Sequence, residues 1–110
     1  MAKKRLAIVL RPGVEPEVRV LAQTLEDLRS VINGYVEHVN PQPGLDVWCD
    51  EDGIGKGLPV CCHIPQGIGE HVIVGDAVLF VVGGKPEKLS DKEWVMAVLK
   101  KYGIRARRVA

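Results

Sequence analysis

The stretch from residue 34 to residue 59 constrains the fold more than any other, because two alternating segments there are joined by a rigid turn. Residues 35–40 and 45–49 each alternate in side-chain character with the period of two that β-strands show. Between them lies Pro41-Gln42-Pro43-Gly44, in which the prolines fix φ and the glycine accepts a positive φ. The pattern predicts an antiparallel hairpin in the middle of the chain.

An acidic, glycine-spaced loop follows this hairpin. Residues 50–57 read DEDGIGKG, and the alternate glycines make the backbone easy to bend. The loop lacks both the spacing and the following helix of a phosphate-binding loop, and its acids would repel an anion. A plain turn is therefore the simpler interpretation. The loop beside Lys56 is nevertheless the best candidate for contact with a small molecule, such as a nucleotide-derived signal that is captured without turnover.

The N-terminal quarter predicts a second hairpin and a helix. The continuous apolar run within residues 4–11 stops at Pro12-Gly13 and indicates a central strand covered on both faces. Residues 16–22 alternate, which is typical of a half-buried strand that pairs back on the first. Thr24, with Asp27 three residues later, begins a helix of about ten residues. Gly34 ends it, and its apolar face comprises Leu25, Leu28, Val31 and Ile32.

The C-terminal half ends in the second helix. Residues 58–64 are apolar and rich in cysteine, and residues 71–82 are the longest strand candidate, interrupted at Gly75-Asp76 by a bulge or a kink. Ser90 and Glu93 form a capping box, and Gly103 ends the helix that follows. Its apolar stripe comprises Trp94, Val95, Val98, Leu99 and Tyr102. Residues 104–110 form a basic tail whose alternation would suit a short extra strand.

These elements predict one α+β domain over residues 1–110, built mainly on antiparallel sheet. The expected order is ββα-ββ-β-α, with the helices packed mostly on one face of the sheet. A chain of 110 residues that is 46% hydrophobic and 26% charged can bury one core but not two. The longest apolar run, residues 77–82, is too short to cross a bilayer, and no secretory signal pattern precedes it. We therefore expect a cytosolic protein without a membrane partner.

The charges are distributed unevenly along the chain although the net charge is only +1. All 14 acidic residues lie between Glu15 and Glu93, whereas many of the basic residues lie near the two ends. Basic ends are more often solvated tails than nucleic-acid contacts, but both interpretations are open. A nucleic-acid interface would use the following residues: Lys100, Lys101, Arg105, Arg107 and Arg108.

Several short motifs occur in an order that resembles a known family. They are Gly34-Tyr35-Val36-Glu37, Cys49-Asp50-Glu51-Asp52-Gly53, Gly57-Leu58-Pro59, Val72-Ile73-Val74-Gly75-Asp76 and Leu89-Ser90-Asp91-Lys92-Glu93. In this order they resemble a small family of uncharacterised domains encoded by phages, plasmids and their bacterial hosts. The resemblance extends from Leu6 to about Leu99 and implies a mobile-element setting, but it implies no reaction. The asparagine usual two residues after Gly-Leu-Pro is Cys61 here.

Metal binding and catalysis find little support in the sequence. The candidate ligands Cys49, Cys61, Cys62, His63 and His71 lack the spacing of a zinc site, and strand alternation would point the adjacent cysteines to opposite faces. Reduced, buried thiols are the simpler interpretation. Ile54 and Cys61 fall where an EF-hand loop needs oxygen ligands. No catalytic triad, nucleophile elbow or assigned carboxylate pair is evident, so we expect neither enzyme activity nor a cofactor.

The leading functional hypothesis is a binding module, encoded by a phage or mobile element, that captures a host protein or a small nucleotide-type ligand. Its candidate contact residues lie on the central hairpin and the loop after it: Tyr35, Glu37, Asp50, Glu51, Asp52 and Lys56. The alternative is a nucleic-acid accessory protein that uses the basic tail. Low aromatic content, 5% of the chain, disfavours a base-stacking surface.

Overall fold

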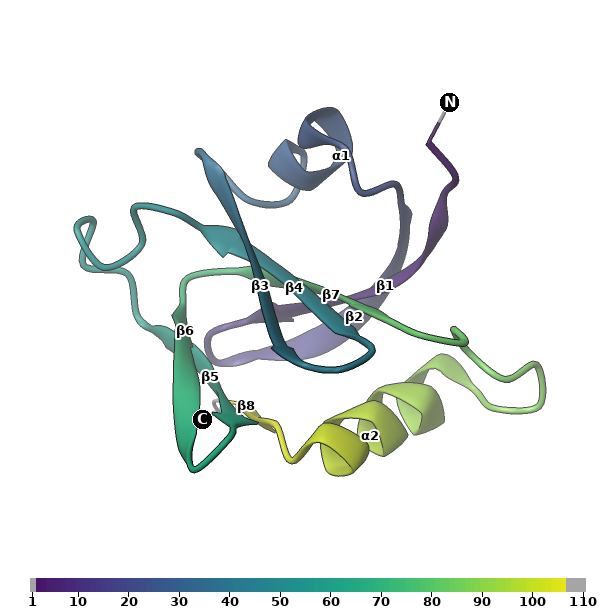
Figure 1. Cartoon of the computed structure of the whole chain (residues 1–110). Coiled ribbons are helices and arrows are strands. Elements are labelled where there is room, and N and C mark those ends of the chain that lie inside the picture. Colours follow the sequence, from purple (N-terminus) through teal and green to yellow (C-terminus); the bar gives the residue numbers. More distant parts are fainter. Residues whose placement is uncertain (1, 107–110) are drawn as a thin grey trace.

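The computed structural model describes residues 2–106, which form eight strands and two helices (Figure 1). In chain order these are β1 (Arg5–Arg11), β2 (Val14–Leu21), α1 (Leu25–Arg29), β3 (Val36–Gln42), β4 (Leu45–Asp50), β5 (Val60–Gln66), β6 (Gly69–Val74), β7 (Ala77–Val81), α2 (Asp91–Tyr102) and β8 (Arg105–Ala106). A five-stranded sheet has the order β2-β1-β7-β4-β3, and a smaller sheet has the order β6-β5-β8. All strand pairs are antiparallel, so the predicted α+β class with mainly antiparallel sheet is confirmed.

Both predicted hairpins are present. β1 pairs with β2 across Pro12-Gly13, where Gly13 has a φ of 69°. β3 pairs with β4 across Pro43-Gly44, and Gly44 has a φ of 80°. In each case the glycine takes the left-handed conformation that other residues avoid. The turns were predicted from this property of glycine.

The two helices cover opposite faces of the large sheet, so the prediction that both pack on one face is wrong (Figure 1). The reason lies in β1, where every residue from Ala7 to Leu10 is buried. Ile8 and Leu10 face the core that α2 closes, whereas Ala7 and Val9 face the core that α1 closes. A strand that is apolar on both sides needs a cover on both sides.

The first helix is much shorter than predicted. Its N-terminus is as expected, because Asp27 N donates to Thr24 Oγ1 at 3.2 Å. The helix nevertheless ends after five residues, and the chain then turns with Ser30 as the C-cap. Leu28 is buried, as the helical pattern predicted, but Leu25 is 63% exposed. Val31 and Ile32 still reach the core from this turn, which explains why the apolar pattern suggested a longer helix.

Residues 71–82 do not form the single interrupted strand that was predicted. β6 belongs to the small sheet and β7 to the large sheet, with Gly75-Asp76 between them. Gly75 has a φ of 74°, and a Cβ there would lie 2.8 Å from Leu58 Cδ1. The glycine thus allows a sharp bend against the loop before β5, and this bend sends the chain from one sheet to the other.

The C-terminal helix follows its sequence pattern closely. Glu93 N donates to Ser90 Oγ at 3.1 Å and Ser90 N donates to Glu93 Oε1 at 2.9 Å, which completes the capping box. Gly103 ends the helix with a φ of 67°. β8 then pairs with β5, so the tail does contribute a short strand, while Arg107 and the residues after it lie outside the described part.

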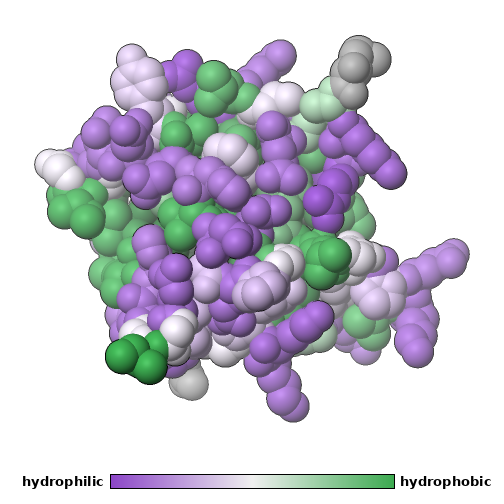
Figure 2. Space-filling view, viewed as in Figure 1, coloured by the Kyte–Doolittle hydropathy of each residue, from purple (hydrophilic) through white to green (hydrophobic). Residues whose placement is uncertain are grey.

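The core on the α2 side also contains the small sheet, which contributes Cys61, Cys62, Ile64 and Ile73. The surface is mostly hydrophilic in the view of Figure 2, with hydrophobic side chains scattered among the polar ones. Ile68, at the tip of the β5–β6 hairpin, is fully exposed. No helix within residues 2–106 is long and apolar enough to span a membrane.

Candidate ligand-binding site

The loop between β4 and β5 is closed by its own backbone. Gly53 N donates to Asp50 O at 3.2 Å, and Lys56 N donates to Asp52 O at 2.9 Å. Leu58 N then donates to Gly53 O at 3.0 Å. These amides therefore already have partners and cannot form an open cradle for a phosphate, which agrees with the interpretation of the loop as a series of turns.

Asp50 is the polar centre of this loop. Its side chain is 4% exposed, and its Oδ2 accepts from Lys56 Nζ at 2.8 Å. Its Oδ1 accepts from the amide of Asp52 at 2.8 Å. Burial acts to raise the pKa of the Asp50 carboxyl, but the hydrogen bonds from Lys56 and Asp52 and the charge of Lys56 outweigh it and hold this pKa below its usual value. The carboxylate thus stays ionised although it is buried.

Lys56 extends from the loop across the turn that follows α1. Its Nζ donates to Asn33 O at 3.1 Å as well as to Asp50, and 42% of its side chain is exposed. Gly34 makes this reach feasible, because a Cβ at position 34 would lie 2.7 Å from Lys56 Nζ. Gly34 also has a φ of 138°, so its role is to give room to the ion pair rather than to end a helix.

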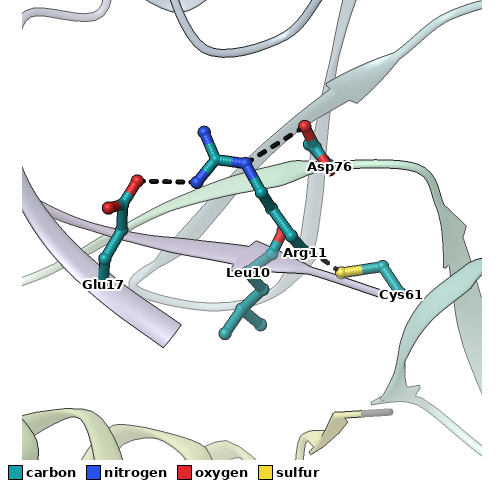
Figure 3. A network of polar contacts seen from close by, with 5 residues as sticks. All are labelled: Leu10, Arg11, Glu17, Cys61 and Asp76. Carbon is teal, nitrogen blue, oxygen red and sulfur yellow. Dashed lines mark hydrogen bonds and ion pairs between the residues drawn. The ribbon is translucent and has the colours of Figure 1, made fainter. Parts of the chain in front are cut away.

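A second ion-pair network forms where β1 ends (Figure 3). Arg11 Nε donates to Asp76 Oδ2 at 3.3 Å, and Arg11 Nη1 donates to Glu17 Oε1 at 2.6 Å. The other terminal nitrogen of Arg11, Nη2, points away from both carboxylates and carries no bond in Figure 3. Arg11 is thereby fixed by two carboxylates while part of its hydrogen-bonding capacity stays unused.

The two networks line one open cleft of about 360 Å³, which we call the Arg11–Lys56 cleft. Four segments form it: the β1–β2 turn, the turn after α1, the β4–β5 loop and the bend before β7. Its lining residues are Arg11, Pro12, Val14, Ile32, Asn33, Asp50, Lys56, Leu58, Pro59, Gly75 and Asp76. The volume falls at the lower end of the range for small-molecule sites, about 300–1,000 Å³. A larger, mainly apolar groove of about 510 Å³ lies between β2 and α2, but it combines fewer converging polar groups.

The structure brings together only part of the predicted contact set. Asp50 and Lys56 line the cleft, whereas Glu37 and Glu51 line a smaller hollow of about 90 Å³ on the other side of Asp50. Tyr35 is 64% exposed and packs under Arg29, whose Cζ lies 4.9 Å from the ring centre. Asp52 is exposed and contributes its amide, not its carboxylate, to the site.

Sequence reasoning missed Arg11, Asn33 and Asp76 as site residues. Arg11 was treated as the end of a strand and Asp76 as part of a kink, yet both line the cleft. The signal that could have drawn attention to them is a charged residue at a strand end next to a glycine turn. That signal alone would not have paired them, because 65 positions separate the two residues in the sequence.

The three cysteines are free thiols buried in the core. The expectation that Cys61 and Cys62 face opposite sides is wrong, because a bulge between Val60 and Cys62 breaks the alternation of β5 and both thiols join one core cluster. Burial raises the pKa of Cys49 to about 12. A hydrogen bond with Cys62, followed by burial, raises the pKa of Cys61, whose Sγ also donates to Leu10 O at 3.4 Å (Figure 3). Within the described residues, no cluster of three or more histidine, cysteine or acidic side chains could hold a metal ion.

Of the residues proposed for nucleic-acid contact, Lys100, Lys101 and Arg105 lie outside the Arg11–Lys56 cleft. Lys100 and Lys101 are exposed in the last turn of α2, and Lys101 Nζ lies 5.4 Å from the ring centre of Tyr102. Arg105 donates to Glu70 Oε2 at 2.6 Å, and Glu70 also contacts His63 Nδ1 at 3.1 Å. Part of the positive charge here is therefore neutralised locally. Arg107 and Arg108 lie outside the described residues, so nucleic-acid binding stays a prediction.

Comparison with known proteins supports the resemblance seen in the sequence. Neither the curated proteins nor the solved structures contain a match to this chain. Residues 3–102 match the model of one family, described as a domain of unknown function (DUF3846). This match covers most of the 110 residues. The chain therefore belongs to the DUF3846 family of domains of unknown function.

Proposed function

We propose that the protein is a non-enzymatic binding module that captures a small nucleotide-type ligand in the Arg11–Lys56 cleft. The observation that carries this proposal is the convergence of two ion-pair networks on one cleft of about 360 Å³. Sites for small ligands typically combine apolar walls with a few fixed polar groups. Here Pro12, Val14 and Leu58 supply apolar wall.

The polar groups of the cleft have hydrogen-bonding capacity to spare. Arginine has more N–H donors than the two that Arg11 uses for Asp76 and Glu17, and the ammonium of Lys56 has one N–H beyond those bound to Asp50 and Asn33. Carboxylate oxygens accept more than one hydrogen bond each, so Asp76 can accept further N–H groups. A ligand with both acceptors and donors on a flat apolar body matches this set.

Capture without turnover fits the protonation states of these groups. A general acid or base works best with a pKa near the working pH. The pKa of Asp50 is lowered instead, and arginine stays charged throughout the accessible pH range. The raised pKa of Cys49, about 12, keeps that thiol protonated and poorly nucleophilic.

Among the partners expected from the sequence, the cleft favours a small ligand over a host protein. Its lining is concave, as in most sites for small molecules, and comes from turns and loops. A phage or mobile-element origin and a cytosolic location belong to the same proposal. The free state of the three thiols supports the cytosolic part, since reducing compartments keep cysteines unpaired.

The proposal is tested by thermal denaturation of the protein with a panel of nucleosides and nucleotides. A ligand that binds only the folded state raises the melting temperature, and the rise grows with the logarithm of ligand concentration above its Kd. The Arg11→Gln variant should lose this shift. Arg105→Gln is the matched control, because Arg105 also pairs with a glutamate at 2.6 Å but lies outside the cleft. A panel without any stabilising member, or a shift that survives in Arg11→Gln, would refute the proposal.

A further inference from the structure

The wall formed by Arg11 and Asp76 carries hydrogen-bond donors on one side chain and acceptors on the other. The Arg11 Nε–Asp76 Oδ2 bond of 3.3 Å holds the two side chains together, and Glu17 fixes the guanidinium from its other end. Within the described residues, neither Arg11 Nη2 nor Asp76 Oδ1 takes part in a hydrogen bond. About one third of each side chain is exposed, and both residues line the cleft.

A donor next to an acceptor matches the edge of a nucleobase. Arginine commonly donates to the O6 and N7 acceptors of guanine, and carboxylates accept from base N–H groups. Guanine also has N1–H and N2–H donors next to O6, so it offers a carboxylate two donors and the arginine an acceptor at the same edge. Adenine, cytosine and uracil each offer the carboxylate only one donor at that edge. The pair therefore favours guanine among the common bases.

The balance of charge in the cleft limits how many phosphates the ligand can carry. Arg11 and Lys56 are the two cationic lining residues, and Asp50 and Asp76 are the two acidic ones. Glu17 adds a further negative charge next to Arg11. With no excess of positive charge, a triphosphate gains little from the cleft, whereas an uncharged nucleoside or a monophosphate avoids the repulsion.

Resting on the proposed function, we infer that the cleft binds a guanine nucleoside or nucleoside monophosphate, with the base edge on Arg11 and Asp76. The base lies between the apolar walls, its O6 accepts from Arg11 Nη2, and its N–H donors point to Asp76. Lys56 contacts the sugar or a single phosphate with its remaining N–H.

Calorimetric titration with guanosine, inosine, adenosine, GMP and GTP tests this inference on the unaltered protein. Guanosine and GMP should bind most tightly. Inosine lacks only the N2 amino group and should bind about 10-fold more weakly or worse, the usual effect of losing a hydrogen bond to a charged group. GTP should bind no better than GMP.

Asp76→Asn supplies the second variant, with Asp46→Asn as a control because Asp46 also pairs with a nitrogen of a side chain on a strand, His38, but lies outside the cleft. Asp76→Asn should abolish the preference for guanosine over adenosine, and Asp46→Asn should keep it. Equal binding of all nucleosides in the unaltered protein would overturn the base assignment while the proposed function stands. Absence of binding by every nucleoside and nucleotide would overturn both.

Discussion

Replacing Lys56 by methionine should destabilise the protein, because it leaves the carboxylate of Asp50 buried without its counter-charge. Asp50 is 4% exposed, and the variant would lose the 2.8 Å bond to it as well as the 3.1 Å bond to Asn33 O. Breaking a fully buried ion pair costs about 3–5 kcal/mol. Since 42% of the Lys56 side chain is exposed, solvent screening reduces this figure, and we expect about 1–2 kcal/mol.

The loss should depend on pH in a defined direction. The folded-state pKa of Asp50 is lowered, so ionised Asp50 contributes stability above its unfolded pKa of about 3.9, and this contribution is lost as the pH falls through the folded value. The variant lacks the Lys56 bond and charge that lower this pKa, while burial still raises it. The difference in stability between the two proteins should therefore be complete at pH 7 and shrink below about pH 4.

Urea denaturation at pH 7 and at pH 3 measures both effects, with the fluorescence of Trp48 and the buried Trp94 as the signal. Lys88→Met is a control for the change of charge, since Lys88 is exposed and lies outside the cleft. Asp50→Asn and the double variant complete a thermodynamic cycle that isolates the pair. A loss at pH 7 no larger than that of the control, or a loss that is the same at both pH values, would refute this account of the loop.

Three further changes test other parts of the structure. Gly34→Ala should cost about 1–3 kcal/mol in urea denaturation, because its Cβ would meet Lys56 Nζ at 2.7 Å in a strained conformation; a neutral change would contradict the role assigned to this glycine. Leu28→Ala should cost about 2–5 kcal/mol and Leu25→Ala well under 1 kcal/mol, because their exposed fractions are 1% and 63%; similar losses would favour the longer helix instead. The three buried thiols should react with a chromogenic thiol reagent only after unfolding in urea, and rapid labelling of the native protein would disprove their burial.

The hairpins and the second helix could be predicted because their signals are local. Pro12-Gly13 and Pro43-Gly44 each mark a turn between two strand-like segments, and the Ser90 capping box and Gly103 mark both ends of α2. Each of these features depends on residues a few positions apart. Periodicity and turn chemistry are informative at that range.

The errors arose where tertiary contacts decided the outcome. Val31 and Ile32 have the spacing of a helix face, yet they reach the core from a turn after the helix has ended. Their burial was therefore predicted correctly, but the length of the helix was not. A bulge in β5 places the side chains of both adjacent cysteines in one core cluster, and an alternating sequence pattern does not predict such a bulge. The bend at Gly75 moved the chain between sheets because Leu58 lies close against that glycine, a contact across 17 positions.

The site was predicted only in the part that is local in sequence. Asp50 and Lys56 are six positions apart in one loop, and the motif containing them drew attention to both. Arg11 and Asp76 meet because β1 and β7 are neighbours in the large sheet, and strand order is not encoded in any short pattern. The cleft therefore combines a contact that the sequence can suggest with one that only the fold can supply.

The Lys56–Asp50 and Arg11–Asp76 ion pairs differ in how readily they can bind a ligand. Lys56 stabilises the loop by holding the buried carboxylate of Asp50, and a ligand that drew Lys56 away would leave that charge unpaired at a cost of about 1–2 kcal/mol. Binding therefore has to keep the Lys56–Asp50 bond and use only the remaining N–H of the lysine. Arg11 is held by Glu17 and Asp76 at two of its nitrogens, so it can donate through its third without breaking either bond. The selective contacts accordingly belong to Arg11 and Asp76, and the loop that first drew attention in the sequence supplies the support.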